Sequence, residues 1–295
     1  MSLAVRKAVI PVAGLGTRLL PVTKSQPKEM LPVGGKPTVQ YIVEELERSG
    51  VSQILLVTGR KKTSIEDHFD PDPDLLRRLS DSGSHELLDA MQFLDRSTTF
   101  FYTRQSAALG NGDAVRLGRD FVGAEPFFVA FGDTIISGPP QARLLARMVR
   151  ALETTDAAAV LAVEEVAPED AYKYGVVQPK NGVGDQFEIT DLIEKPSAGS
   201  APSTMAIAAR YLFTPEVFKA IDMTMPGKGG EVWLADSIRV LLKQGASVHC
   251  VRLGPGEQRY DIGNFESYFK AFVDFALADE RYGYLLRQHL QKRLG

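Results

Sequence analysis

Cysteine is almost absent from this sequence, which has a single one, Cys250, in an apolar run. A disulfide framework is therefore excluded, and we expect a buried, unreactive thiol in a protein of the reducing cytoplasm. Long hydrophobic runs are missing too. No segment approaches the roughly 18 consecutive apolar residues of a membrane-spanning helix, and the N-terminus lacks the apolar core of a signal peptide. We therefore expect no membrane partner.

Net charge and histidine are equally scarce. The formal net charge is −3, which provides no general attraction to nucleic acid or to an anionic membrane, so any polyanion must be held by local basic groups. The four histidines show no metal-ligand spacing, and the sequence contains no Ser-His-Asp or Cys-His arrangement. These absences argue against a zinc site and against a covalent nucleophile.

Two common nucleotide motifs are also missing, because Leu19 stands where GxGxxG needs its third glycine and no GK[ST] follows. What is present is an apolar run, 7–13, that leads directly into Gly14-Leu-Gly-Thr-Arg18. The run predicts a buried strand, and Gly14 and Gly16 allow backbone N–H groups to approach an anion closely. A turn that binds no ligand is the alternative for this segment taken alone.

Apolar segments alternate with amphipathic ones through the first half of the chain. Strands are predicted at 51–58, 98–103, 126–131, 157–164, 174–178, 187–194 and 206–213. Helices are predicted at 39–49, 64–69, 113–119 and 141–153, and in the stretch 264–293 the apolar residues of 265–276 have the spacing of one helical face. Near-continuous apolar strands separated by helices indicate an α/β fold with a mainly parallel sheet covered on both faces.

Ligands of such sheets bind beyond the carboxyl ends of the strands, where Gly14, Gln105 and Asp133 are all expected to emerge. Asp133 follows a strongly apolar strand, and Mg²⁺ needs only one or two carboxylates beside phosphate oxygens and water. Asp261, beside a glycine turn, is available as the second carboxylate. A helix cap is the alternative role for Asp133.

Taken together, Gly14-Leu-Gly-Thr-Arg18 and Pro27-Lys-Glu-Met-Leu-Pro32 resemble the signature of the sugar-nucleotide pyrophosphorylases, and within them the bacterial UTP–glucose-1-phosphate uridylyltransferases. The resemblance runs from Lys7 to about Phe272. It implies a Rossmann-like mixed, mainly parallel sheet flanked by helices, as in nucleotide-diphospho-sugar transferases. It also implies one domain over 1–295, with a nucleotide-binding half at about 1–135, a sugar-binding half at about 136–262 and C-terminal helices at about 263–295.

The implied enzyme forms UDP-glucose and pyrophosphate from UTP and glucose 1-phosphate, with Mg²⁺, by in-line attack on the α-phosphate. Its partners are UTP and a hexose 1-phosphate, and a homo-oligomer, either dimer or tetramer, is expected. The resemblance assigns catalysis to Arg18, Lys28, Asp133 and Lys195, and the metal to Asp133 and Asp261. It assigns nucleotide binding to Ala13, Gly14, Gly16, Thr17, Glu29, Gln105 and Gly110. It assigns sugar binding to Gly175, Glu194, Lys195 and Glu231.

Two of these positions also carry an expectation from their own chemistry. The Gln105 amide can meet both a donor and an acceptor, as the imide edge of uracil requires. Pro196 biases Lys195 toward an extended backbone, so that the Glu194 and Lys195 side chains diverge. An exposed, solvated ion pair is the alternative for these last two residues.

Three positions depart from the uridylyltransferase pattern. Asp113 replaces a usual histidine, Thr134 a frequent acidic residue and Trp233 a polar one. Trp233 matters most, because its indole stands two residues from Glu231 and can reshape the sugar pocket. Two alternatives therefore stay open: transfer of a thymidylyl group or use of another hexose 1-phosphate, and a catalytically silent subunit that binds sugar nucleotides and regulates a partner.

Overall fold

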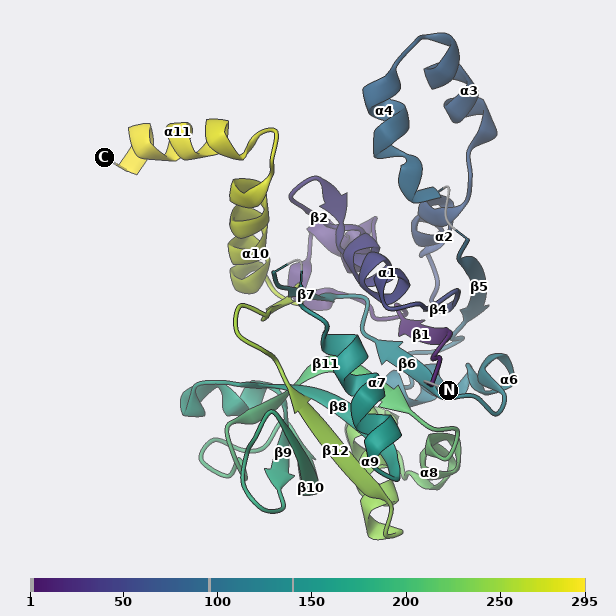
Figure 1. Ribbon diagram of the computed structural model, residues 1–295, viewed down its shortest axis with the longest axis vertical. Coiled ribbons are helices and arrows are strands. Elements are labelled where there is room, and N and C mark those ends of the chain that lie inside the picture. Colours follow the sequence, from purple (N-terminus) through teal and green to yellow (C-terminus); the bar gives the residue numbers. More distant parts are fainter. Residues whose placement is uncertain (1–2, 95–96, 140, 295) are drawn as a thin grey trace.

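The computed structural model describes residues 3–94, 97–139 and 141–294, built around a nine-stranded sheet (Figure 1). In spatial order the strands are β5 (Thr99–Arg104), β4 (Gln53–Thr58), β1 (Lys7–Pro11), β6 (Phe127–Ala130), β11 (Met205–Phe213), β8 (Ala157–Glu165), β12 (Ser247–Arg252), β10 (Gln186–Glu194) and β9 (Gly175–Pro179). The eight strands predicted from sequence are confirmed, and β12 is an addition.

The expected predominance of parallel pairing does not hold across the whole sheet. Strands β5, β4, β1 and β6 are parallel, as predicted. Beyond β6, the pairs β6–β11, β11–β8, β12–β10 and β10–β9 are antiparallel, and only β8–β12 is parallel. For β9 and β10 the reason is the short loop 180–185, because parallel neighbours would need a longer crossover connection.

Helices cover both faces of the sheet. The α-helices are α1 (Thr38–Arg48), α2 (Thr63–Phe69), α3 (Pro73–Asp81), α4 (His85–Ala90), α5 (Asn111–Arg116), α6 (Arg119–Val122), α7 (Leu144–Thr154), α8 (Val217–Met223), α9 (Leu234–Lys243), α10 (Phe265–Ala278) and α11 (Gly283–Leu294). Alternate residues of β1 serve the two faces: Ile10 belongs to the core with α1 and α7, and Val9 to the core with α5, α8 and α9. Burial on both sides explains the near-continuous apolar strands.

Short elements complete the chain. Two small antiparallel pairs are β2 (Pro32–Val33) with β3 (Lys36–Pro37), and β7 (Thr134–Ser137) with β13 (Gln258–Asp261). The 3₁₀ turns are η1 (Thr17–Leu19), η2 (Val22–Lys24), η3 (Lys28–Met30), η4 (Gln92–Leu94), η5 (Pro168–Lys173) and η6 (Lys228–Gly230). Within the described ranges, no helix has the length and apolar character to cross a membrane.

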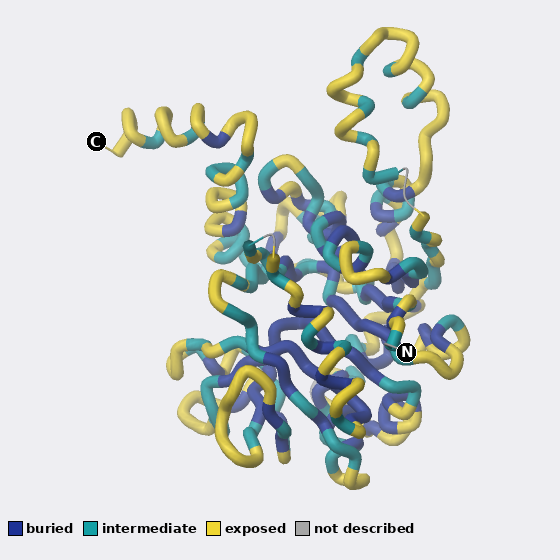
Figure 2. Tube along the Cα trace, in the orientation of Figure 1, coloured by how far each residue is buried: buried dark blue, intermediate teal, exposed yellow. Residues whose placement is uncertain are grey.

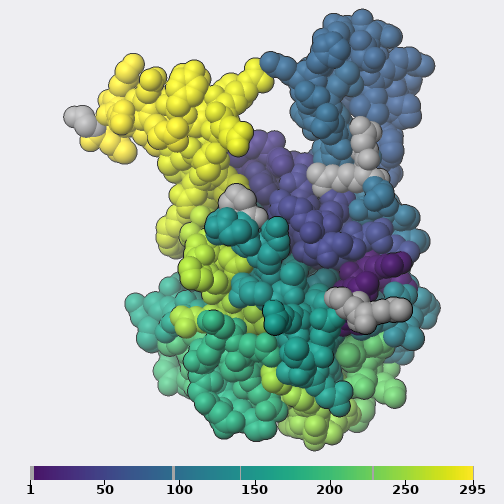
Figure 3. All heavy atoms as spheres, viewed as in Figure 1, coloured from purple at the N-terminus to yellow at the C-terminus, as the bar shows by residue number. Residues whose placement is uncertain are grey.

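Helices α3, α4 and α11 stand out from the body and are mostly exposed (Figures 2 and 3), whereas α10 packs against the core through Phe265, Tyr268 and Phe275. An ion pair between Arg281 Nη1 and Glu86 Oε2 at 2.9 Å joins the turn between α10 and α11 to α4. The apolar helical face predicted in the stretch 264–293 lies on α10, and the chain leaves that helix after Ala278. The Asp279 carboxylate accepts the N–H groups of Arg281 and Tyr282 at 3.0 and 2.7 Å, which restarts the chain in a new direction as α11.

Candidate active site

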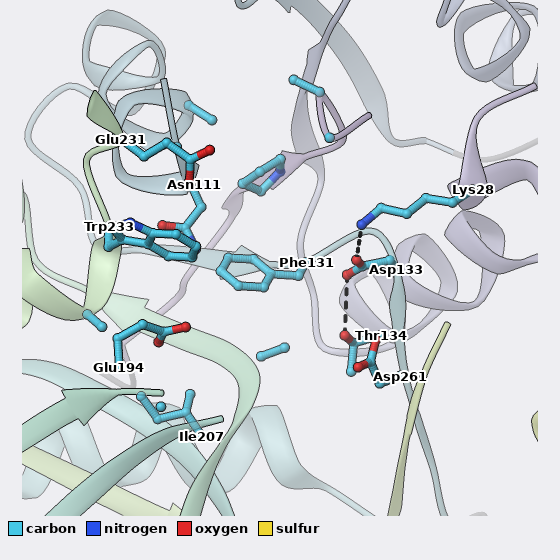
Figure 4. Close-up of a pocket in the computed structure, with 18 of the residues that line it drawn as sticks. Lys28, Asn111, Phe131, Asp133, Thr134, Glu194, Ile207, Glu231, Trp233 and Asp261 are labelled. Atoms are coloured by element: carbon cyan, nitrogen blue, oxygen red, sulfur yellow. Dashed lines mark hydrogen bonds and ion pairs between the residues drawn. The ribbon is translucent and has the colours of Figure 1, made fainter. Parts of the chain in front are cut away.

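A cavity of about 490 Å³ lies where β1, β5 and β6 end, and it extends across to β9, β10 and β11 (Figure 4). As the strand order predicts, Gly14, Gln105 and Asp133 all line it. The other residues that the sequence assigned to the site line it too: Ala13, Gly16, Thr17, Arg18, Lys28, Glu29, Gly110, Gly175, Glu194, Lys195, Glu231 and Asp261. The cavity therefore gathers residues from both halves of the chain.

The glycine loop after β1 bends back over Lys28. A Cβ atom added to Gly14 would lie 3.5 Å from Lys28 Nζ, so the bare backbone lets the ammonium approach. Gly16 has a φ of 66°, a left-handed conformation that glycine adopts without strain. Its carbonyl accepts a hydrogen bond from Thr23 Oγ1 at 2.7 Å, which closes the loop.

Asp133 and Asp261 meet because β7 pairs with β13. The register places Asp261 opposite Thr134, and the Ile262 N–H donates to the Asp133 carbonyl at 2.8 Å. Arg18 reaches the same point: a Cβ on Gly263 would lie 2.7 Å from Asp261 Oδ1 and 2.8 Å from Arg18 Nη2. Neither strand of this pair was predicted from the sequence, yet their pairing unites two acidic residues with the glycine loop.

The charges at this point perturb one another strongly. Lys28 forms an ion pair with Asp133. Burial lowers the pKa of Lys28, but the neighbouring carboxylates of Asp133, Glu29 and Asp261 raise that pKa by more, so it lies above its ordinary value. For Asp133, burial raises the pKa, yet the Lys28 ammonium brings it below the ordinary value. Burial and the charge of Asp133 raise the pKa of Asp261.

This donor set fits a magnesium ion that also binds phosphate. The described residues contain no group of three or more His, Cys, Asp or Glu side chains able to hold a metal ion by themselves. Mg²⁺ does not require such a group, since one or two carboxylates suffice when phosphate oxygens and water complete the shell. The raised pKa of Asp261 beside Asp133 indicates two carboxylates whose repulsion a cation would relieve.

At one end of the cavity, Gln105 has fewer free hydrogen-bonding groups than expected. Its amide nitrogen donates to the Gly110 carbonyl at 3.1 Å and to Asp113 Oδ2 at 2.7 Å. Both N–H groups are thus used within the protein, so the amide oxygen is the group of this side chain that could meet a ligand. Asp113, which forms an ion pair with Arg116, is therefore the residue that orients this amide. The sequence marked Asp113 only as a departure.

Glu29 is deeply buried and lies 2.7 Å from Lys62 Nζ. Burial raises the pKa of Glu29 by more than Lys62 and Lys28 lower it. Sequence reasoning missed Lys62. The available signal was its place in the basic run 60–62, shortly after the end of β4 at Thr58. Its ammonium supports the Glu29 carboxylate at the wall of the cavity.

At the other end of the cavity, Glu194 lies over Gly175. The two residues pair across β10 and β9, and a Cβ on Gly175 would stand 2.9 Å from Glu194 Oε2. The extended backbone expected for Lys195 is wrong, because its φ is 47°, in the left-handed region. The Lys195 N–H donates to the carbonyl of Tyr174, the residue before β9, at 3.0 Å, and this bond outweighs the preference imposed by Pro196.

Two further cavity residues define this side. Trp233 faces the cavity rather than the core, lying between Glu231 and Glu194 with its indole directed toward Phe131 (Figure 4). Arg259 was missed, although its position two residues before Asp261 was a signal. It forms an ion pair with Glu164, and its guanidinium lies 4.1 Å from the centre of the Tyr174 ring.

Comparison with known proteins agrees with this arrangement. Residues 7–277 match the nucleotidyl transferase family. The chain is 40% identical over 279 residues to a UTP–glucose-1-phosphate uridylyltransferase of Bacillus subtilis (strain 168), covering 94% of this chain and 92% of that protein.

Solved structures show the same fold at high similarity. The UTP-bound UGPase from Acinetobacter baumannii has a TM-score of 0.89 and 31% identity, covering 97% of this chain and 99% of that one. A UDP-glucose pyrophosphorylase complexed with UDP-glucose has a TM-score of 0.83 and 33% identity, covering 93% and 100%. The chain therefore belongs to the nucleotidyl transferase family.

Proposed function

We propose that the protein is a UTP–glucose-1-phosphate uridylyltransferase, which makes UDP-glucose and pyrophosphate from UTP and glucose 1-phosphate. The observation that carries this proposal is the single cavity that joins the glycine loop, the Asp133–Asp261 pair and the Glu194–Lys195 corner. The cavity therefore has basic side chains, Arg18 and Lys28 on one side and Lys195 on the other, on both sides of the space for the substrate phosphates. The chain would act as one unit, since the same sheet supports the nucleotide and sugar residues.

In this proposal a phosphate oxygen of glucose 1-phosphate attacks the α-phosphorus of UTP. A new P–O bond forms as the bond to the β-phosphate oxygen breaks, and pyrophosphate leaves from the opposite side. Arg18 stabilises the departing pyrophosphate, Lys28 the phosphates at the reacting centre and Lys195 the incoming sugar phosphate. Bound between Asp133 and Asp261, Mg²⁺ would supply charge neutralisation on the phosphates.

Recognition of the two substrates falls to the opposite ends of the cavity. On the nucleotide side, the Gln105 amide oxygen accepts the N3–H of uracil, while Asp113 keeps the amide from turning. Ala13, Gly14, Gly16 and Thr17 border the phosphates, with Glu29 and Gly110 closer to the base. On the sugar side, Glu194 and Glu231 accept hydrogen bonds from hydroxyl groups, and Gly175 leaves room for the ring.

We further propose that the protein acts as a homo-oligomer in the cytoplasm. Its one cysteine, Cys250, is buried and free, as suits a reducing compartment. Three apolar side chains of α10 are exposed and can meet another subunit: Phe269, Phe272 and Val273.

The experiment that tests the activity measures pyrophosphate release with purified protein and Mg²⁺, using UTP or dTTP with glucose 1-phosphate or another hexose 1-phosphate. The proposal expects the highest kcat/KM with UTP and glucose 1-phosphate. A preference for dTTP or another sugar would reassign the substrate. No release with any pair, together with measurable binding of UDP-glucose by calorimetry, would instead identify a silent binding subunit.

A further inference from the structure

The ammonium group of Lys195 does not extend freely into the cavity. Its Nζ lies 4.7 Å from the centre of the Trp233 ring and 3.6 Å from Glu194 Oε1. The face of an indole is its negative side, so a cation placed over it is attracted electrostatically. Lys195 is thus held between an aromatic face and a carboxylate, at the corner where a sugar phosphate would enter.

The backbone on both sides of this contact is held firmly. Lys195 adopts a left-handed φ of 47°, which a lysine keeps only when its surroundings enforce it, here through the bond to the Tyr174 carbonyl. Trp233 directly precedes α9. Its neighbour Val232 donates to the Leu109 carbonyl at 2.8 Å and accepts from the Gly112 N–H at 2.9 Å. The aromatic face is therefore anchored to the loop that carries the nucleotide residues.

We propose, on the basis of the function proposed above, that Trp233 is a positioning residue for the sugar 1-phosphate. Before binding, the indole holds the Lys195 ammonium at the sugar end of the cavity. A phosphate carries full negative charge and attracts the ammonium more strongly than a ring face does, so binding transfers Lys195 from the ring to the phosphate. The vacated indole face then covers the C–H face of the hexose.

The position of Trp233 makes this role specific to one substrate. It lies between Glu231 and Glu194, on the sugar side, and Lys28 and Asp133 lie beyond Phe131 (Figure 4). A change at Trp233 should therefore alter the use of glucose 1-phosphate and leave the use of UTP nearly intact. A residue that merely filled space in the fold would affect both substrates together.

The first experiment compares steady-state kinetics of wild type, Trp233→Leu and Trp233→Phe. Leucine keeps an apolar side chain but removes the aromatic face, and phenylalanine retains one. Trp233→Leu is expected to raise KM for glucose 1-phosphate roughly tenfold and to change KM for UTP by less than about twofold. Trp233→Phe, which retains an aromatic face, is expected to keep KM for glucose 1-phosphate much closer to that of the wild type. Equal changes in both KM values, or an unchanged KM for glucose 1-phosphate in Trp233→Leu, would overturn the proposal.

The second experiment uses the fact that the chain has only one tryptophan, so its fluorescence reports on Trp233 alone. UDP-glucose is expected to change the emission of the wild type, and UTP alone is not. Lys195→Met should already show shifted emission without ligand and a much smaller response to UDP-glucose. The matched control Lys180→Met removes an exposed lysine that lies outside the cavity and pairs with Glu188.

The outcomes of this second experiment are separable. Binding of UDP-glucose is measured by calorimetry for each variant, so that a missing signal is not confused with missing binding. If wild type and Lys195→Met have the same emission and the same change in emission on adding UDP-glucose, the proposed transfer of the Lys195 ammonium from the indole to the phosphate is refuted. If the proposed function itself is wrong, the pyrophosphate-release assay will show it, because the wild type will then release no pyrophosphate with any substrate pair.

Discussion

Asp133 and Asp261 carry opposite pKa shifts although both are held at one wall of the cavity. The difference comes from Lys28, whose ammonium contacts Asp133 and lowers its pKa despite burial. Burial and the negative charge of Asp133 both raise the pKa of Asp261. The positive charges of Arg259, Arg18 and Lys28 lower that pKa by less, so it stays above its ordinary value. A divalent cation with phosphates would let both carboxylates ionise together.

Asp133→Asn is the direct test of this cluster. The change keeps the shape of the side chain but removes the charge that faces the proposed metal and Lys28, so we expect kcat to fall by roughly 100-fold to 1,000-fold. Lys28 keeps Glu29 and Asp261 as neighbouring charges, and Tm should therefore shift by less than about 5 °C. Pyrophosphate release and calorimetry measure the two effects.

Asp120→Asn, an exposed aspartate on α6, is the control for that substitution. Full activity in Asp133→Asn would contradict the assigned role, as would complete unfolding of the variant, since Asp133 would then act in the fold rather than in the reaction.

Residues of this kind differ in how well a sequence reveals them. Gly14, Gln105 and Asp133 follow apolar strands, and their convergence was predicted from the strand ends. Lys62 and Asp113 could not be found in that way, because each acts through a second residue that is distant in the chain or in a separate turn. The pairing of Lys62 with Glu29, and of Asp113 with Gln105, is seen only once the strands are packed.

At the scale of elements, the turn before α5 is clamped to the turn before α9. Gly110 has a φ of 95°, and a Cβ there would lie 2.8 Å from the backbone nitrogen of Val232. Gly110→Ala is therefore expected to push these turns apart, raising KM for UTP several-fold and lowering the free energy of unfolding by about 2 kcal/mol. Kinetics and urea denaturation test this expectation.

Gly123→Ala is the matched control for the Gly110 variant. Gly123 also has a positive φ, 65°, but no atom would lie within 4 Å of an added Cβ. It therefore reports the backbone strain of alanine without the collision. If the free energy of unfolding falls equally in the two variants and KM for UTP is unchanged in both, the contact between the two turns does not contribute to UTP binding.

Helix α2 carries a pH-dependent contact with α1. His68 Nε2 lies 3.0 Å from Gln40 Oε1, and its ring stacks on Phe93 with centroids 4.8 Å apart. Burial lowers the pKa of His68 below its ordinary 6.5. As pH falls below 6.5, the unfolded chain binds this proton before the folded one does, so the free energy of unfolding decreases.

We expect His68→Gln to lack this contribution. Between pH 7.5 and 5.5 the wild type should lose more stability than the variant, as measured by urea denaturation of both proteins at each pH. Parallel losses in the two proteins would show that His68 does not contribute to acid sensitivity.

At the scale of the whole molecule, α10 presents a row of exposed apolar side chains. Phe269 is 58% exposed, Phe272 39% and Val273 42%. We expect this face to lie in the subunit contact of the proposed homo-oligomer. Phe269→Ser combined with Phe272→Ser should reduce the mass in sedimentation to that of a monomer, while Val183→Ser, exposed in the loop between β9 and β10, should not. A monomeric wild type at micromolar concentration would contradict this expectation.

The sequence by itself determined the apolar strands, the glycine loop and the order of the charged motifs along the chain. These features depend on local periodicity and on the chemistry of neighbouring residues, which a linear sequence displays. Only the tertiary structure decided that the later strands pair antiparallel, that β13 brings Asp261 to Asp133, and that Trp233 faces the cavity beneath the Lys195 ammonium. Such outcomes depend on which distant surfaces can be buried together, and no local pattern encodes that choice.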